Sequence, residues 1–170
     1  SEMCIRDREI GDVEEITMAL KTYTEYEISD SLARADFAAS VRILDELINK
    51  ESISPTYILG VIAKFFRDIL IAKLGLEQKN ADRKAIFKEL YPNIPERFRQ
   101  LYDRKFRELF SLVEYLSWEK LNSILGALRE VDLKMKTTGE SPQILLEGFL
   151  FESCRLMKIR SKNVILKGLD

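Results

Sequence analysis

The segment that most constrains the fold is PTYILGVIAKFFRDILIAKLGL, residues 55–76, which is apolar almost all round. Only Lys64, Arg67, Asp68 and Lys73 interrupt it. A helix with so narrow a polar strip has to be surrounded by other helices. Four charges within the segment argue against a membrane span, and Lys64 and Asp68, spaced i and i+4, are expected to pair on a solvent-exposed strip. The segment therefore predicts the central helix of a bundle.

Shorter amphipathic patterns occupy most of the remaining chain. After Asp36, the apolar residues Phe37, Val41, Leu44 and Ile48 recur with helical spacing. Residues that can cap a helix precede this and other patterns, namely Asp12, Ser54 before Pro55, Asn80, Ser117 and Ser141 before Pro142. Gly139 is expected to end the helix that starts after Ser117. No long segment alternates with period two and no repeat is present, so the sequence predicts an all-α bundle of about five to seven helices.

Composition sets the class of protein. The chain has 170 residues, of which 46% are hydrophobic and 32% charged, and its net charge is −1. This composition is that of a soluble globular domain without bulk attraction to nucleic acid or anionic lipid. No apolar run has transmembrane length, and no signal-peptide core is present. Cys4 and Cys154 form no disulfide framework, so a reducing compartment is expected.

The residues available for chemistry are few. The chain has no histidine, which removes His-dependent nucleophiles, His-ligated zinc and the usual general base. Two cysteines cannot form a four-thiolate site, and the seven glycines are too scattered for a phosphate-binding loop. We therefore predict no catalytic, metal-binding or cofactor-binding residue, and neither binding nor hydrolysis of ATP by this chain.

A basic and aromatic cluster, RFRQLYDRKFR at residues 97–107, raises the possibility of a nucleic-acid-binding helix. A solvated helix face is the preferred interpretation, because Arg99 can pair with Asp103 and Arg104 with Glu108 at i, i+4 spacing. Asp132 and Lys136 have the same spacing and predict a structural ion pair on the surface. The basic residues of 159–170 are interpreted as a solvated tail.

Three stretches follow one another along the chain. The first is EISDSLARADFAASVRILDELINKE, and the second is the apolar segment with Phe65, Phe66 and Arg67 at its centre. The third and most specific is VDLKMKTTGESPQILLEGFLFESC, in which an acidic residue, a lysine, a polar loop and Leu-Glu follow one another. In this order they resemble the C-terminal collar region of the bacterial DNA polymerase III delta subunit, from about Thr24 to Met157. Residues 79–115 match mainly as a helix pattern.

The resemblance implies a clamp-loader collar fold over residues 24–158 and a role in subunit assembly during DNA replication. The implied partners are delta-prime-like and gamma/tau-like subunits, with the sliding clamp and primer-template DNA reached only through the full, cytoplasmic assembly. It implies no membrane and no small-molecule substrate. Members of the family carry an AAA+ module ahead of the collar, and residues 9–23 resemble the last helix of its lid. The alternatives are a stand-alone nucleic-acid-binding helical protein and a generic helical adaptor.

The first eight residues, SEMCIRDR, match the in-frame translation of the end of a common transposase-based sequencing adapter. Residues 1–8 are therefore expected to be an adapter artefact, and the intact gene is expected to differ before Glu9 and to continue into an AAA+-like module. Cys4 is then not expected to belong to the natural protein. Cys154, in an apolar helix, is expected to be a buried and inert thiol.

Partner contacts are expected near the end of the domain. In PQILLEGFLFESCRLM, one face carries Leu145, Phe149 and Leu156, and another carries Leu146, Leu150 and Met157. One face can fill the core of the bundle while the other is free for a partner. Trp118 is a further candidate anchor, because large aromatic residues are enriched in interface hot spots. The predicted interface residues are Trp118, Leu145, Phe149 and Leu156.

Overall fold

The computed structural model describes residues 27–78, 82–92 and 99–158, which are helical apart from short connections and contain no strand. Residues 27–33 form the first described helix. The elements that follow are α2 (Phe37–Asp45), the π-helical turn η1 (Glu46–Lys50), α3 (Pro55–Gln78), α4 (Arg83–Leu90), α5 (Arg99–Tyr115), α6 (Trp118–Thr137) and α7 (Pro142–Lys158). The all-α prediction is confirmed. No helix in these ranges is long and apolar enough to cross a bilayer.

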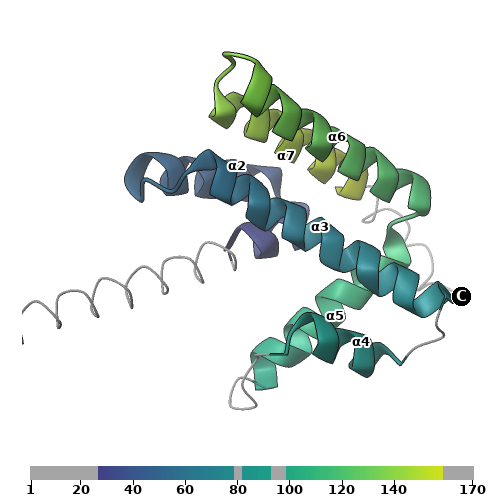
Figure 1. Cartoon of the computed structure of the whole chain (residues 1–170). Helices are drawn as coiled ribbons and strands as arrows, with labels where there is room; N and C mark the ends of the chain where they lie inside the picture. Colours follow the sequence, from purple (N-terminus) through teal and green to yellow (C-terminus); the bar gives the residue numbers. More distant parts are fainter. Residues whose placement is uncertain (1–26, 79–81, 93–98, 159–170) are drawn as a thin grey trace, which may run out of the picture.

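Helix α3 is the centre of the bundle, as its all-round apolar pattern predicts. It packs against α4, α5, α6 and α7. Figure 1 shows α6 and α7 paired on one side of α3, and α4 and α5 on the other. Ile58, Ile62, Phe66 and Ile69 of α3 are completely buried. One helix therefore supplies side chains to both halves of the core.

Most of the predicted helix starts are correct, because each depends on a capping bond between residues only a few positions apart. The Asp36 side chain accepts a hydrogen bond from the Ala39 N–H at 3.0 Å. Ser54 Oγ accepts one from the Tyr57 N–H at 3.2 Å, and Ser117 Oγ accepts one from the Lys120 N–H at 3.3 Å. These bonds satisfy N–H groups that the first helical turn leaves unpaired. Asp12 and Asn80 lie outside the described residues.

Two local predictions need correction. Helix α6 ends at Thr137, and the N–H of its C-cap residue Thr138 donates to the Lys134 carbonyl. Gly139 follows directly after this cap, as predicted, but none of the described glycines has a positive φ, so Gly139 is not a left-handed cap. The apolar stripe of α2 is also rotated. Ser40 is fully buried. Burial is tolerated because its hydroxyl forms hydrogen bonds, with Oγ 2.8 Å from the Asp36 carbonyl and 3.0 Å from Ser31 Oγ. Leu44 and Leu47 then face the core.

Candidate functional site

The structure places two of the predicted interface residues inside the core. Leu145 and Phe149 of α7 are 9% and 3% exposed, and the Phe149 ring packs edge-on against Phe66 of α3 at 6.0 Å. Leu146 and Leu150, on the other apolar face of α7, are completely buried as well. The prediction of a free Leu145–Phe149 face is therefore wrong, because both apolar faces of α7 are covered by this chain's own helices. Leu156 is half-buried.

A third face of α7 is exposed and apolar instead. Ile144 and Phe151 are 67% and 54% exposed, and Gly148 lies between them at helical spacing, with open space where a Cβ would be. The Phe151 ring makes an edge-on contact with Phe37 of α2 at 5.4 Å. We call Ile144, Gly148, Phe151 and Phe37 the α7 surface.

The charges beside the α7 surface already have partners. Lys134 lies 2.9 Å from Glu130 on α6, and Arg155 lies 2.6 Å from Glu152 on α7. The bond to Glu130 raises the pKa of Lys134, and the bond from Arg155 lowers the pKa of Glu152. A molecule that docks here would therefore meet apolar side chains beside charges that are already neutralised.

Trp118 does not stand free as an anchor. Its indole N–H donates to both carboxylate oxygens of Glu77, at 2.9 and 3.0 Å. Lys73 lies over the Trp118 ring, 5.4 Å from its centroid, and also donates to the Val113 carbonyl at 3.1 Å. These contacts join the start of α6 to the end of α3, so the half-buried indole has a role within the fold.

The predicted ion pair between Asp132 and Lys136 is present on α6, with 2.6 Å between Nζ and Oδ2. Both side chains are largely exposed. An exposed pair of this spacing stabilises a helix by about 0.3–0.5 kcal/mol. It is a surface feature of α6 and carries no chemistry.

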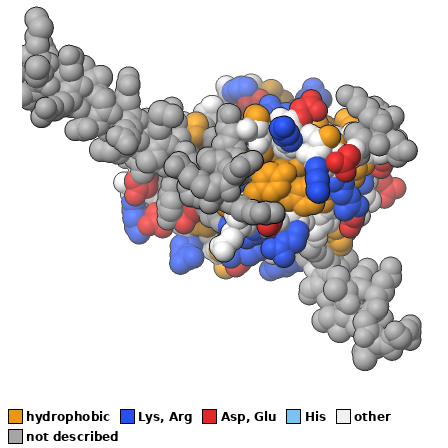
Figure 2. Space-filling view, turned by 90° about the horizontal axis from the view of Figure 1, so that it is seen from below, with side chains coloured by type: hydrophobic (Ala, Val, Ile, Leu, Met, Phe, Trp, Pro, Cys, Tyr) orange, Lys and Arg blue, Asp and Glu red, His pale blue; other side chains and the backbone are white. Residues whose placement is uncertain are grey.

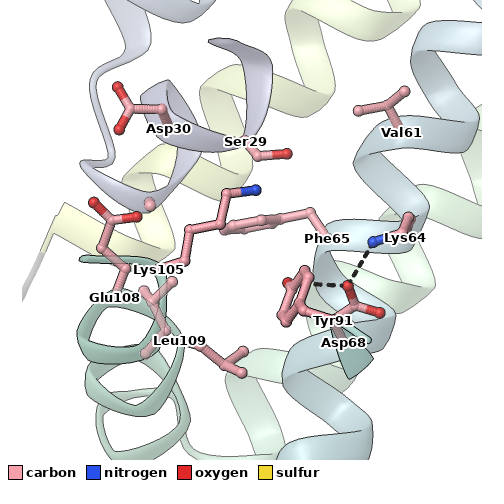
Figure 3. A pocket seen from close by; sticks show the side chains of 12 residues that line it. Ser29, Asp30, Val61, Lys64, Phe65, Asp68, Tyr91, Lys105, Glu108 and Leu109 are labelled. Atoms are coloured by element: carbon pink, nitrogen blue, oxygen red, sulfur yellow. Dashed lines mark hydrogen bonds and ion pairs between the residues drawn. The ribbon is translucent and has the colours of Figure 1, made fainter. Parts of the chain in front are cut away.

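A partly enclosed cavity lies between helix 27–33, α3 and α5 (Figure 3) and measures about 60 Å³. Asp68 on its wall is 3% exposed. Its carboxylate accepts hydrogen bonds from Lys64 Nζ at 2.9 Å and from Tyr91 Oη at 3.1 Å. The predicted Lys64–Asp68 pair thus exists, but the carboxylate is buried rather than solvent-exposed, because Tyr91, after α4, folds over it.

Burial raises the pKa of two side chains that line this cavity. Burial, followed by the nearby Asp68 carboxylate, raises the pKa of Tyr91 far above its ordinary value. Burial, followed by Asp30, also raises the pKa of Glu108, although Arg104 and Lys105 oppose the shift. Ligand pockets usually measure about 300–1,000 Å³, so this space is too small to enclose a nucleotide. The cluster is best explained as a polar link between helices.

The basic residues of α5 are engaged within the fold. Arg104 approaches Glu108 at 3.9 Å, and Arg107 donates to the Asp103 carbonyl at 3.2 Å. Figure 2 shows this side of the molecule, with hydrophobic side chains in the middle and side chains of both charges around them. Arg97 and the side chain of Arg99 lie outside the described residues. No described feature favours the nucleic-acid-binding alternative.

Metal-binding side chains are not gathered in the described ranges. Within them, no group of three or more Cys, Asp or Glu side chains could hold a metal ion. Cys154 is buried, and burial raises the pKa of its thiol, which keeps it protonated and unreactive. Together these features define a helical module that exposes large apolar side chains.

The comparison with known families identifies this module. Residues 24–153 match the family model described as the DNA polymerase III delta subunit, C-terminal domain. The chain belongs to this family, and it is a clamp-loader delta-like subunit of DNA replication. No curated protein and no solved structure matches the chain. The resemblance inferred from residues 24–157 is confirmed, whereas residues 1–8, 9–23 and 159–170 lie outside the described residues.

The α7 surface was not predicted, although the sequence carries a signal for it. Ile144, Gly148, Phe151 and Arg155 are spaced i, i+4, i+7 and i+11 and therefore line one face of a helix. The residues chosen instead, Leu145 and Phe149, form an equally regular stripe. Periodicity finds apolar stripes, but it does not say which of three stripes on one helix is left uncovered.

Proposed function

We propose that this domain is a collar-type assembly domain, which holds the delta-like subunit in the clamp loader through the α7 surface. The observation that carries the proposal is the pair of exposed side chains Ile144 and Phe151 with the open Gly148 between them. Scattered apolar residues are normal on protein surfaces. A row of them on one helix face, beside charges that are already paired, fits a surface that another protein covers.

The partners in this proposal are delta-prime-like and gamma/tau-like subunits of the clamp loader. The sliding clamp and primer-template DNA are reached through the complete assembly, in the cytoplasm. The domain contributes no catalytic group of its own, and the ATP is hydrolysed by other subunits. Contacts between unlike subunits in a ring are heterologous, so the α7 surface is expected to meet a different surface on its neighbour.

Co-expression with the other clamp-loader subunits of the same genome tests the proposal. Phe151→Asp is expected to weaken the complex about 30-fold, which corresponds to an interface hot spot of about 2 kcal/mol. Gly148→Leu is a second variant that leaves the Phe37–Phe151 contact intact and fills the open position. Ala85→Asp is the matched control, because Ala85 is exposed on α4, on the other side of α3 from α7 (Figure 1).

Circular dichroism and thermal melting of each variant separate binding from folding. Loss of the complex in Phe151→Asp and Gly148→Leu with unchanged helicity, and retention in Ala85→Asp, is the expected pattern. Leu145 and Phe149 are unsuitable targets, since changes at buried residues would unfold the domain. A complex that persists in an Ile144→Asp/Phe151→Asp double variant would refute the proposed interface.

A further inference from the structure

A second exposed surface lies between α3 and α6. These helices run antiparallel, because Trp118 at the start of α6 contacts Glu77 near the end of α3, while Thr56 and Asp132 line the opposite end of the pair. Figure 1 shows α6 lying along α3. An apolar groove follows the contact between them, and its lining includes Leu59 and Ala63 of α3 and Leu125 and Leu128 of α6.

Gly60 forms an open wall of this groove. It is exposed in the second turn of α3, and no atom lies within 4 Å of the place where a Cβ would be. Glycine inside a helix destabilises it by about 0.5–1 kcal/mol relative to alanine. Nothing in the described chain needs the space that Gly60 leaves, so that space is available to another molecule.

The groove-side face of α3 continues beyond the groove with an exposed apolar residue. Ile71, three turns after Gly60, is 41% exposed. From Gly60 to Ile71 the face of α3 is about 16 Å long at 1.5 Å per residue. This length suits a helix of about three to four turns.

Two arginines along the groove have no partner in the part of the chain that the structure describes. Arg129 lines it, and Arg67 lies on the α3 face between Gly60 and Ile71. Both are exposed, and neither forms an ion pair or hydrogen bond within the described part of the chain. The acid at the groove, Asp132, is already paired with Lys136 at 2.6 Å.

We propose that the groove between α3 and α6 binds an amphipathic helix of another polypeptide, whose apolar stripe is flanked by acidic side chains. The stripe would pack on Leu59, Leu125 and Leu128, with a large side chain in the space beside Gly60. The acids would meet Arg67 and Arg129. This is the helix-in-groove mode of recognition, and it is independent of the α7 surface.

The apolar floor favours a helix over nucleic acid. Arginine binds carboxylate and phosphate equally well in geometric terms, so the two cations alone do not decide. Phosphates would gain nothing from the leucine side chains of the floor, whereas an apolar stripe gains about 25 cal/mol for each Å² that it buries. Nucleic acid therefore remains as an outcome of the test.

The test uses the whole chain and two labelled synthetic peptides of about 16 residues, which as helices are about 24 Å long and so span the whole face of about 16 Å. Both carry leucines at i, i+4, i+7 and i+11, and they differ only in the flanking residues, which are Glu in one peptide and Lys in the other. Fluorescence anisotropy gives the affinities, and amide chemical shifts locate the bound peptide. The Glu peptide is expected to bind at least tenfold more tightly than the Lys peptide, with shifts along α3 and α6.

Three variants sharpen the result. Gly60→Leu is expected to weaken binding of the Glu peptide at least tenfold while preserving or raising the melting temperature. Gly126→Leu is the matched control, because Gly126 is exposed on α6 with open space around it but does not line the groove. The double variant Arg67→Glu/Arg129→Glu is expected to reverse the preference and to bind the Lys peptide more tightly.

Several outcomes would overturn the proposal. They are equal affinity for the two peptides, no measurable binding of the Glu peptide, and an unchanged affinity in Gly60→Leu. Shifts confined to α7, with binding lost in Phe151→Asp, would move the peptide to the α7 surface. A duplex oligonucleotide that displaces the peptide and binds more tightly would assign the two arginines to nucleic acid.

Discussion

Removal of the Asp68 carboxylate is the most informative test of how this bundle is held together. Asp68 is 3% exposed and accepts hydrogen bonds from Lys64 at 2.9 Å and Tyr91 at 3.1 Å. The bond from Tyr91 attaches the chain after α4 to the central helix. If the cluster is a structural link, its loss should destabilise the whole domain and should leave helix content below the transition unchanged.

The two bonds differ in what they contribute. A hydrogen bond to a charged group contributes about 1.5–3 kcal/mol, but the Lys64 side chain is 42% exposed and returns to water when its partner is lost. Although the Asp68 carboxylate is buried, an ion pair whose cation stays in contact with water is expected to contribute little more than a surface pair, about 0–1 kcal/mol. We therefore expect Asp68→Ala to lower the free energy of unfolding by about 2–4 kcal/mol, Tyr91→Phe by about 1–2 kcal/mol, and Lys64→Met by less than about 1 kcal/mol.

Urea denaturation at pH 7, followed by circular dichroism, measures these values. The double variant Asp68→Ala/Tyr91→Phe closes a cycle, and the coupling energy of the two groups is expected to be about 1–2 kcal/mol. If the two single variants lower the free energy of unfolding additively, the hydrogen bond between Tyr91 and Asp68 contributes no stability. A loss in Lys64→Met as large as that in Tyr91→Phe would also refute the reasoning, because the exposed ion pair would then dominate.

Three further predictions concern titration and backbone strain. The pKa of Glu108 is raised from 4.5, so the native state keeps this proton to a higher pH than the unfolded chain does. Ionisation of Glu108 therefore destabilises the fold, and Glu108→Gln should become more stable relative to the parent as pH rises above about 4.5. The pKa of Tyr91 is raised from 10.0, so the stability that its protonated phenol supplies should be lost as pH rises beyond 10, and Tyr91→Phe should remove that loss in alkaline urea titrations. Ser52 is exposed with a φ of 54°, and Ser52→Gly should therefore raise the free energy of unfolding by about 0.5–1 kcal/mol, the left-handed penalty less the entropy of glycine.

Much of the fold follows from short-range signals in the sequence. The central position of α3 could be predicted because a helix with so few polar residues needs neighbours on most sides. Helix starts at Asp36, Ser54 and Ser117 could be predicted because a capping bond involves residues only a few positions apart. The buried Ser31–Ser40 pair could not, since it depends on the packing of helix 27–33 against α2. The π-helical turn at Glu46–Lys50 has no comparable short-range signal in the sequence.

The surfaces were harder to predict than the core. Helix α7 is apolar on three faces, and only the packing of α2, α3 and α6 decides that Leu145 and Phe149 are covered while Ile144 and Phe151 are not. Trp118 was expected at an interface, but Glu77, distant in sequence, lies within hydrogen-bonding distance of its indole. In each case the missing information was a long-range contact between helices.

The exposed face of α3 is further evidence that this domain packs against other chains. Its nearly all-round apolar pattern predicts burial on most sides, yet Thr56, Gly60 and Ile71 are exposed, because α4 to α7 cover only part of the helix. In a domain that works alone, charged side chains would be expected at these exposed positions. Helix α3 therefore has fewer charged residues than its exposure within the described chain would favour. That shortage of charged residues, like the open face at Gly148 on α7, is what a subunit that completes its packing against other chains would require.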